Sequence, residues 1–280
     1  RGNRTPILFV PSMHSDIFDD SVTRDLLKTL RDEGSAVMIS EIEEGRRKQP
    51  DPISIVANFC NMVNKELPGR RIVAITLGAN RAPIDDVRAI QNASSGSTGW
   101  TIAEYLHRMG HQVICIAGKT SSHPSFTLPD VRRAGSPDSM LSAAKTVASG
   151  QPQPDAWIHS AAVLDYYTEP INGKKPSGDD PWELILIPGV KHIAELSPLV
   201  DGAIRIGFKL ESDVSDELLV LKAKEQIERY GVDAVVANLK DEIHDPDTLR
   251  GRFVRSDGTV DDIHDDAELC QMIESLLNAA

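Results

Sequence analysis

The sequence predicts an α/β protein built on a Rossmann-like, doubly wound and mainly parallel sheet with helices on both faces. From residue 71 onward, short apolar runs alternate with segments of helical periodicity, which is the pattern of parallel strands joined by crossover helices. Loops rich in glycine, serine and alanine follow several of these runs. Ligands bind beyond the carboxyl ends of the strands in such a sheet, so these loops are the place to look for a site.

The first 69 residues are expected to form a smaller unit of their own. Its predicted elements are a strand at residues 6–10, a helix at 21–33, a strand at 36–40 and a helix at 53–67. Pro68 and Gly69 then interrupt the helical pattern. A length of 280 residues fits two domains, which we place at residues 1–69 and 70–280. The chain does not begin with Met, so we expect that the gene product starts earlier or was trimmed.

The second unit carries the regular alternation of strands and helices. Its predicted strands are residues 71–77, 111–117, 155–163, 182–187, 203–208 and 232–237. Its predicted helices are residues 98–109, 138–149, 190–196, 215–230 and 265–277, and long loops cover residues 78–96 and 166–181. A buried stripe at helical spacing is expected on the fourth of these helices, formed by Val220, Ala223, Ile227 and Tyr230. Asp257 and Gly258 predict a hairpin turn within residues 253–263.

The composition excludes several classes of protein. Lys and Arg number 30 against 42 Asp and Glu, which gives a net charge of −12 at pH 7. An acidic chain with 5% aromatic residues is a poor match to a nucleic-acid surface or an anionic membrane, so neither is expected as a partner. No apolar run reaches the ~18 residues of a membrane span, and no signal peptide is visible. We therefore expect a cytoplasmic protein.

The cysteines and histidines lack the spacing of a metal site. Three widely spaced cysteines are expected to be buried, reduced thiols: Cys60, Cys115 and Cys270. The histidines form no HExxH motif and no zinc-type pair, so no metal ligand is predicted among the cysteines and histidines. Four histidines are expected on the surface or in loops: His14, His107, His111 and His264.

A serine–glycine segment opens the helix at residues 98–109. Ser94, Ser95 and Gly96 come first, and Gly99 follows three positions later. Free N–H groups and the positive end of the helix dipole favour a phosphate at such a helix start. The loop lacks the first glycine of GxGxxG and the lysine of a P-loop. A simple cap and turn is therefore the alternative explanation.

Small and basic residues follow the next strands. Ala161 and Ala162 would let a ligand ring lie on the backbone, and Asp165 would accept from ribose hydroxyls or hold a metal. The alternative is that the alanines belong to the core and that the aspartate caps a turn. Lys174 and Lys175 form a pair that is usually a solvated surface, but in an acidic chain that handles phosphates they become candidate ligands.

Lys222 lies beside the stripe on the helix at residues 215–230 and leans toward the start of that helix. A solvated lysine is the alternative. Asn238 ends an apolar strand and would equally cap a turn.

Five segments in order along the chain resemble the phosphopantothenoylcysteine synthetase family, also called phosphopantothenate–cysteine ligases. They are GANRAPIDDVRAIQNASSGSTG at residues 78–99, AAVLDY at 161–166, GKKPS at 173–177, GFKLE at 207–211 and KAKEQIERYGVDAVVAN at 222–238. The resemblance covers about residues 70–275, and several motifs in the correct order are far more specific than any one of them.

Residues 6–58 resemble the last part of a flavodoxin-like, FMN-dependent phosphopantothenoylcysteine decarboxylase domain. That domain precedes the synthetase in bifunctional coenzyme A biosynthesis proteins, and its P-A-M-N/H segment matches residues 11–14. The front of the domain is absent from this sequence, and residues 40–50 lack the cysteine of the substrate flap. We expect no decarboxylase activity from this chain alone, and FMN only if the complete domain is present in the gene product.

The resemblance implies a ligase reaction in two steps. 4′-Phosphopantothenate attacks the α-phosphate of CTP or ATP and releases pyrophosphate, and L-cysteine then attacks the acyl-nucleotide and releases the monophosphate. Mg²⁺ would accompany the nucleotide, and the family usually forms a homodimer. The sequence does not decide between CTP and ATP.

The resemblance also assigns roles to residues. Asn92 would grip the acyl-phosphate, and Lys174 would neutralise charge at the α-phosphate, so these two are the expected catalytic residues. The expected nucleotide- and substrate-binding residues are Gly78, Arg88, Ser94, Ser95, Gly96, Ala161, Ala162, Asp165, Phe208 and Lys222.

Departures from the family pattern keep two alternatives open. The chain has Asn80 and Ala82 where the family usually has Thr and Glu, and Ser97 and Thr98 where Lys and Met are common. It has Gln226 where a basic residue is expected. An inactive regulatory homologue would explain such changes. An NAD(P)-binding Rossmann oxidoreductase would share the fold, but the loop after residue 77 lacks GxGxxG and its acidic partner.

Overall fold

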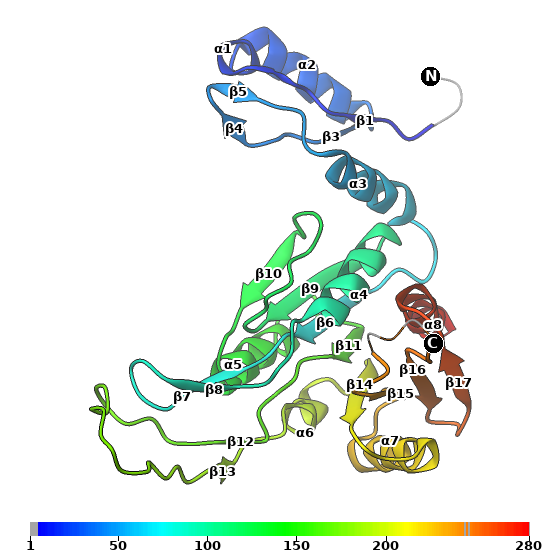
Figure 1. The fold of residues 1–280 in the computed structure, drawn as a ribbon. Coiled ribbons are helices and arrows are strands. Elements are labelled where there is room, and N and C mark those ends of the chain that lie inside the picture. Colours follow the sequence, from blue (N-terminus) through cyan, green and yellow to red (C-terminus); the bar gives the residue numbers. More distant parts are fainter. Residues whose placement is uncertain (1–4, 244, 246, 280) are drawn as a thin grey trace.

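A computed structural model describes residues 5–243, 245 and 247–279, so the outermost ends of the two predicted domains, residues 1–4 and 280, lie outside it. An 8-stranded sheet forms the centre of the molecule (Figure 1). Across the sheet the strands are β10 (Asp130–Arg133), β9 (Gln112–Ala117), β6 (Ile72–Leu77), β11 (Ala156–His159), β14 (Ile204–Glu211), β15 (Ala234–Leu239), β16 (Gly251–Arg255) and β17 (Val260–Ile263). All neighbours from β10 to β15 pair in parallel, and β16 and β17 add an antiparallel hairpin. The predicted mainly parallel α/β fold is confirmed.

Helices cover both faces of this sheet. The helices are α3 (Pro52–Asn64), α4 (Ser97–Arg108), α5 (Pro137–Ala148), α6 (His192–Leu196) with the short 3-10 turn η1 (Ser197–Leu199), α7 (Asp216–Tyr230) and α8 (Asp266–Ala279). One buried cluster joins α3, α4 and α8 to the sheet, whereas two others join α5, α6 and α7 to its opposite face. Alternate residues of β6 serve the two faces, because Val73 and Ile75 lie in the first cluster and Ala74 in the second. The sheet is therefore doubly wound, as predicted.

The buried stripe of α7 differs by one position from the prediction. Ala223 and Ile227 are buried as expected, but Leu219 is the third buried residue of the helix. Val220 and Tyr230 are half-buried and pack at its margin. A stripe with steps of four keeps the side chains on one line facing β15, which explains the shift.

Two predictions about titratable side chains need correction. His107 and His111 are buried and do not lie on the surface. His107 is on the inner side of α4, with its ring centroid 5.5 Å from that of Phe126, and His111 Nδ1 accepts from the Arg71 N–H at 3.1 Å. Of the expected buried thiols, Cys115 and Cys270 are buried and Cys60 is half-buried; all three are free. Burial raises the pKa of the Cys115 and Cys270 thiols to about 12.

The N-terminal segment stands apart from the large sheet (Figure 1). It contains α1 (Ser15–Phe18), α2 (Ser21–Asp32), a parallel pair of β1 (Leu8–Phe9) with β3 (Ala36–Val37), and a sheet of β2 (Met13–His14), β5 (Arg46–Arg47) and β4 (Ile42–Glu43). The helix α3 joins it to the rest by packing against α4. Asn61 and Asn64 donate from Nδ2 to the last carbonyls of α4, on His107 and Arg108, both at 2.8 Å. The boundary at residue 69 stays a prediction.

Three segments differ from their predicted structure. The predicted loop at 78–96 contains a hairpin of β7 (Arg81–Pro83) and β8 (Ala89–Gln91), and β10 is an edge strand that the sequence did not predict. The strand predicted at 182–187 is wrong, because only Ile187 is in a strand. It belongs to β13 (Ile187–Pro188), which pairs with β12 (Tyr166–Tyr167) outside the large sheet. The apolar run is exposed, so it is not the core strand that its composition suggested.

Across the described residues, every helix is too short or too polar to cross a membrane.

Candidate active site

Three loops meet at the carboxyl edge of the sheet, after β6, β9 and β11. The Ala79 carbonyl, after β6, accepts from the N–H of Lys119, after β9, at 2.8 Å. The Gly78 carbonyl accepts from the N–H of Ala162, after β11, at 2.9 Å. Backbone bonds thus fix the three loops against one another before any ligand binds. This is the edge at which parallel sheets bind ligands.

Two glycines cross at the centre of this edge. Gly78 and Gly96 both have φ of +82°, a left-handed conformation that favours glycine. A Cβ on either would lie 2.6 Å from Thr120 Cγ2, and one on Gly96 would also lie 3.3 Å from Gly78 Cα. Both positions therefore require glycine for conformation and for space. The crossing leaves bare backbone beside the start of α4.

The first turn of α4 has the features that favour an anion. Gly96 is its N-cap and supplies no side-chain acceptor. Ser95 Oγ accepts from the Ser97 N–H at 3.2 Å, while the next N–H groups, of Thr98 and Gly99, have no acceptor within the helix. These N–H groups and the helix dipole favour a phosphate at this end of α4. A Cβ on Gly99 would lie 2.4 Å from Leu77 Cβ, so glycine also allows the helix to lie close to β6.

Asn92 lies between this turn and the loop after β11. Its Nδ2 donates to the Ala162 carbonyl at 3.0 Å, and its own carbonyl accepts from the Ser94 N–H at 2.9 Å. The side chain is half-buried. The structure therefore brings together Asn92, the serine–glycine turn and the Ala161–Ala162 backbone, which were singled out from three separate motifs.

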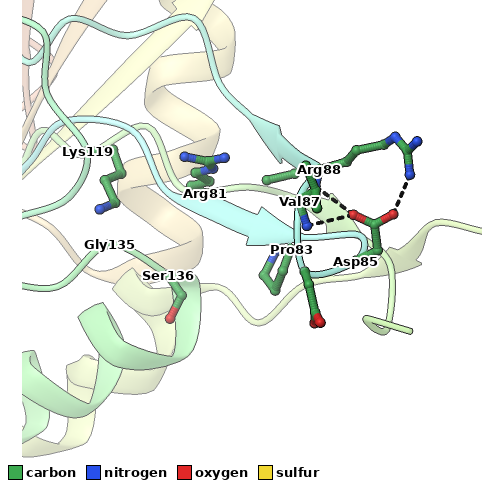
Figure 2. A pocket seen from close by; sticks show the side chains of 10 residues that line it. Arg81, Pro83, Asp85, Val87, Arg88, Lys119, Gly135 and Ser136 are labelled. Carbon is green, nitrogen blue, oxygen red and sulfur yellow. Dashed lines mark hydrogen bonds and ion pairs between the residues drawn. The ribbon is translucent and has the colours of Figure 1, made fainter. Parts of the chain in front are cut away.

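Arg88 lies at the tip of the β7–β8 hairpin and binds Asp85 there. The Asp85 carboxylate accepts from the Arg88 guanidinium and from the N–H groups of Val87 and Arg88 (Figure 2). It also accepts from the N–H of Lys175. Burial of Asp85 raises its pKa, but these hydrogen bonds outweigh burial and bring it to about 2. The carboxylate is therefore ionised at neutral pH, and it fixes the hairpin tip.

Lys174 lies on the segment that runs beside this tip. Its neighbours anchor the backbone, since Asp86 N donates to Gly173 O at 3.3 Å and Lys175 N donates to Asp85 Oδ2 at 3.2 Å. The Lys174 side chain is exposed and makes no contact with Asn92 in the part of the chain that the structure describes. Four residues of chain separate Arg88, at the tip, from Asn92, which is a span of up to roughly 13 Å if they are extended. The described contacts do not bring the two expected catalytic residues together.

The remaining expected ligands lie on later strand ends. Asp165 is exposed and forms an ion pair with Lys191. Phe208, on β14, is half-buried against the core. Lys222 Nζ contacts Glu211 Oε2 at 2.7 Å, and that hydrogen bond is the main cause that lowers the pKa of Glu211. Lys222 is therefore held near the end of β14 by a carboxylate whose role the sequence did not suggest.

The Gln226 amide lies against β14. A Cβ on Gly207 would be 2.5 Å from Gln226 Nε2.

Three basic residues at this edge were not predicted as site residues. Arg250 is buried and donates to Thr98 Oγ1 at 2.8 Å, while Arg81 and Lys119 line a cavity beside the hairpin. Arg81 and Lys119 follow strand ends, which was the available signal, whereas Arg250 precedes β16 and comes to the site only through folding. Among the described residues no group of three His, Cys, Asp or Glu side chains is arranged to hold a metal.

The family of the chain follows from comparison with known proteins. The family model described as "DNA/pantothenate metabolism flavoprotein C-terminal domain" matches residues 67–268. The chain belongs to this family. The resemblance to phosphopantothenoylcysteine synthetases is confirmed at this level.

Curated relatives of this flavoprotein C-terminal domain family are longer than the chain. The coenzyme A biosynthesis bifunctional protein CoaBC of Thermococcus kodakarensis is 35% identical over 235 residues, which are 84% of this chain and 57% of that protein. The protein of the same name from Mycobacterium tuberculosis is 27% identical over 278 residues, which are 91% of this chain and 66% of that protein. The chain thus spans about six tenths of the length of these relatives.

Solved structures of this family share the fold. A DNA/pantothenate metabolism flavoprotein from Streptococcus pneumoniae superposes with a TM-score of 0.65 at 23% identity, covering 75% of this chain and 99% of that one. The C-terminal domain of a CoaBC protein gives a TM-score of 0.60 at 24% identity, and the match covers 77% of this chain and 100% of that one. A Cab2 mutant in complex with phosphopantothenate-cysteine gives a TM-score of 0.58 at 20% identity, and the match covers 82% of this chain and 94% of that one.

Proposed function

We propose that the chain is a phosphopantothenate–cysteine ligase of coenzyme A biosynthesis. The observation that carries the proposal is the junction of Asn92, the Ala162 carbonyl and the open first turn of α4, because it sets an amide donor beside a phosphate site. Family membership supports it, as do the names of the CoaBC relatives and the ligand of the Cab2 complex.

The first step joins the acid to a nucleotide. A carboxylate oxygen of 4′-phosphopantothenate attacks the α-phosphorus of CTP, the bond from that phosphorus to the β-phosphate oxygen breaks, and pyrophosphate leaves. The crossing of Gly78 and Gly96 lets the phosphates approach the backbone, and Ser94 and Ser95 add hydroxyl donors. Lys174 neutralises the charge that develops at the α-phosphate. This requires the segment that carries Lys174 to move its ammonium toward Asn92 and the start of α4.

The second step forms the amide. The neutral amine of L-cysteine attacks the acyl carbon, the C–O bond to the phosphate breaks, CMP leaves, and the amine loses a proton. Asn92 holds the acyl-phosphate so that the carbon faces the amine, and orientation of this kind is a large part of such catalysis. Ala161, Ala162 and Asp165 border the pantothenate and nucleotide, Phe208 lies against the base, Arg88 pairs with a substrate phosphate, and Lys222 exchanges Glu211 for the triphosphate.

The nucleotide substrate is the Mg²⁺ complex of CTP, with ATP as the other candidate. Mg²⁺ prefers phosphate oxygens and water over a protein cage, which suits a site where the described residues form no metal-binding group. FMN belongs to a complete decarboxylase domain, and neither step uses it. The ligase is expected to work in the cytoplasm.

We also propose that the ligase is a homodimer. Residues 184–187, which run into β13, are four consecutive exposed apolar residues, and Ile185 is 80% exposed. A run of this kind on a soluble surface favours coverage by another protein surface. A second copy of the chain supplies an identical apolar run, so a two-fold contact between the copies would bury both runs.

Release of pyrophosphate from CTP tests the function. It should require phosphopantothenate, and formation of phosphopantothenoylcysteine should require L-cysteine as well. CTP and ATP are compared under the same conditions. Binding of NAD(P) without pyrophosphate release would favour the oxidoreductase, and nucleotide binding without any turnover would favour an inactive homologue.

A further inference from the structure

The cavity lined by Arg81 and Lys119 lies between the β7–β8 hairpin and the start of α5. Its volume is ≈ 340 Å³. Arg81 and Lys119 lie at one end of it, and the Arg88–Asp85 pair lies at the other (Figure 2). Neither step of the proposed ligase reaction uses Arg81 or Lys119.

The charges at the two ends differ. Arg88 and Asp85 neutralise one another through their ion pair. Arg81 and Lys119 are exposed and have no carboxylate partner among the residues that the structure describes, and Asp86 is the one other carboxylate in the lining. The cavity therefore carries one excess positive charge within a chain of net charge −12. Two cations left unpaired in so acidic a protein indicate a site for an anion.

The backbone holds both cations in place. Lys119 N donates to the Ala79 carbonyl at 2.8 Å, next to the glycine crossing, and Arg81 N donates to the Gly135 carbonyl at 2.8 Å. The stem of Lys119 lies over Gly135, where a Cβ would be 2.9 Å from Lys119 Cε. The absence of a side chain at position 135 therefore makes room for the lysine.

We propose that Arg81 and Lys119 bind a small anionic group of a ligase substrate, and this rests on the proposed function. A cavity at the small end of the range for ligand sites suits a group of the size of a carboxylate or phosphate with a few attached atoms. Two substrates carry such a group away from the reacting atoms: the carboxylate of L-cysteine and the terminal phosphate of 4′-phosphopantothenate. The triphosphate belongs to the separate site at α4.

The test compares KM for all three substrates in Arg81→Gln, Lys119→Gln and the wild type. Both variants should raise KM about tenfold or more for one of the two non-nucleotide substrates, since each loses a charge-assisted hydrogen bond, and should leave KM for CTP within about twofold. A rise for L-cysteine assigns the site to a carboxylate, and a rise for phosphopantothenate assigns it to a phosphate. Unchanged KM for both, or a rise confined to CTP, overturns the proposal.

Two further variants control for loss of charge and for general damage. Gly135→Ala keeps both cations but displaces Lys119, so it should raise KM for the same substrate. Lys145→Gln removes an exposed cation at the far end of α5 and should leave every KM unchanged. Urea unfolding of each variant shows whether the fold is intact.

Acetylation of Lys119 gives a readout independent of turnover. Inorganic phosphate or acetate should slow its modification by an acetylating reagent, as mapped by mass spectrometry, with Lys145 in the same digest as the internal reference. Protection should vanish in Arg81→Gln. If Lys119 is protected but the chain has no ligase activity, the anion site is supported and the proposed function fails. If turnover is normal, Lys119 is not protected and KM is unchanged in the variants, the anion site is refuted and the proposed function stands.

Discussion

The guanidinium of Arg250 donates from Nη2 to Oγ1 of Thr98 at 2.8 Å and so ties the approach to β16 to the first turn of α4. The same guanidinium donates to Asn238 Oδ1 at 3.1 Å and to Asp266 Oδ1 at 2.7 Å. Its side chain is 8% exposed. A single buried cation thus connects α4, the end of β15 and the start of α8, and it fixes the turn at which we place the phosphates.

Replacing Arg250 with Leu should lower the free energy of unfolding by about 3 kcal/mol. The change removes three hydrogen bonds and leaves the buried Asn238 oxygen and the half-buried Thr98 hydroxyl without this donor. Urea unfolding measures the change. Thr98→Val is the matched control, because it removes one of the three bonds and should cost about 1 kcal/mol. Equal losses in the two variants would show that the connection matters little.

Asn92→Asp should lower turnover about 100-fold or more. The variant keeps the shape of the side chain but removes the amide donor and adds negative charge beside the phosphate site. Pyrophosphate release and amide formation are measured together. Turnover at the wild-type rate would refute the role of Asn92.

Lys174→Gln should also lower turnover about 100-fold, without a change in stability, since the side chain is exposed. Lys175→Gln is the control, because the Lys175 ammonium lies 5.0 Å from the centre of the Trp182 ring and its anchoring bond comes from the backbone. Turnover in the control should stay within about threefold of the wild type. Similar losses in both variants would indicate a general effect of charge on the loop.

The free energy of unfolding should fall as the pH is lowered from 6.5 toward 4, in part because of His111. Burial lowers the pKa of this imidazole from 6.5 to about 4, and nearby Arg70 adds to the shift. Between these values the unfolded chain takes up a proton that the folded chain does not, so stability is lost at up to about 1.4 kcal/mol per pH unit.

His111→Asn keeps an acceptor for the Arg71 N–H but does not titrate, so its slope of stability against pH should be shallower than that of the wild type. Urea unfolding at several pH values gives both slopes. His123→Asn, at an exposed position, should keep the wild-type slope. The same slope in all three proteins would contradict the assignment.

Ile185→Asp should convert the proposed homodimer to a monomer. Ile185 is the most exposed of the apolar residues before β13, and a carboxylate there would be buried without a partner in a two-fold contact. Light scattering coupled to gel filtration measures the mass. Asp179→Asn, at an exposed polar position of the same segment, should leave the mass unchanged. A wild-type chain that is already monomeric would refute the dimer.

The sheet could be predicted from the sequence because its inner strands are short apolar runs with clear ends. The strand predicted at 232–237 is β15, and Asp257 and Gly258 lie at the turn between β16 and β17 as predicted. β10 escaped prediction because an edge strand needs few apolar residues, and its sequence is Asp-Val-Arg-Arg. The strand at 182–187 was wrongly predicted because the run is rich in apolar residues. Apolar residues do not reveal whether the surface that covers them belongs to the same chain.

The candidate site was predictable only as separate motifs. The sequence analysis placed Asn92 and Ser95 in the long loop after one strand and Ala162 at the end of another, and a parallel sheet brings such segments to one edge. Partners that depend on side-chain direction were not accessible, as Glu211 beside Lys222 and Arg250 beside Thr98 illustrate. The same holds for His107, because a histidine in a helix has no sequence mark that tells whether it faces the core.

Asp85 binds both the guanidinium of Arg88 and the backbone of Lys175, so the hairpin tip and the lysine segment are fastened by one carboxylate. Ile171 N also donates to Ile84 O at 3.0 Å, so Asp85 and Ile84 both join the hairpin to the lysine segment. A displacement of the hairpin would therefore carry Lys174 with Arg88. In the proposed reaction, the pairing of Arg88 with a substrate phosphate would then be coupled to the approach of Lys174 to the α-phosphate.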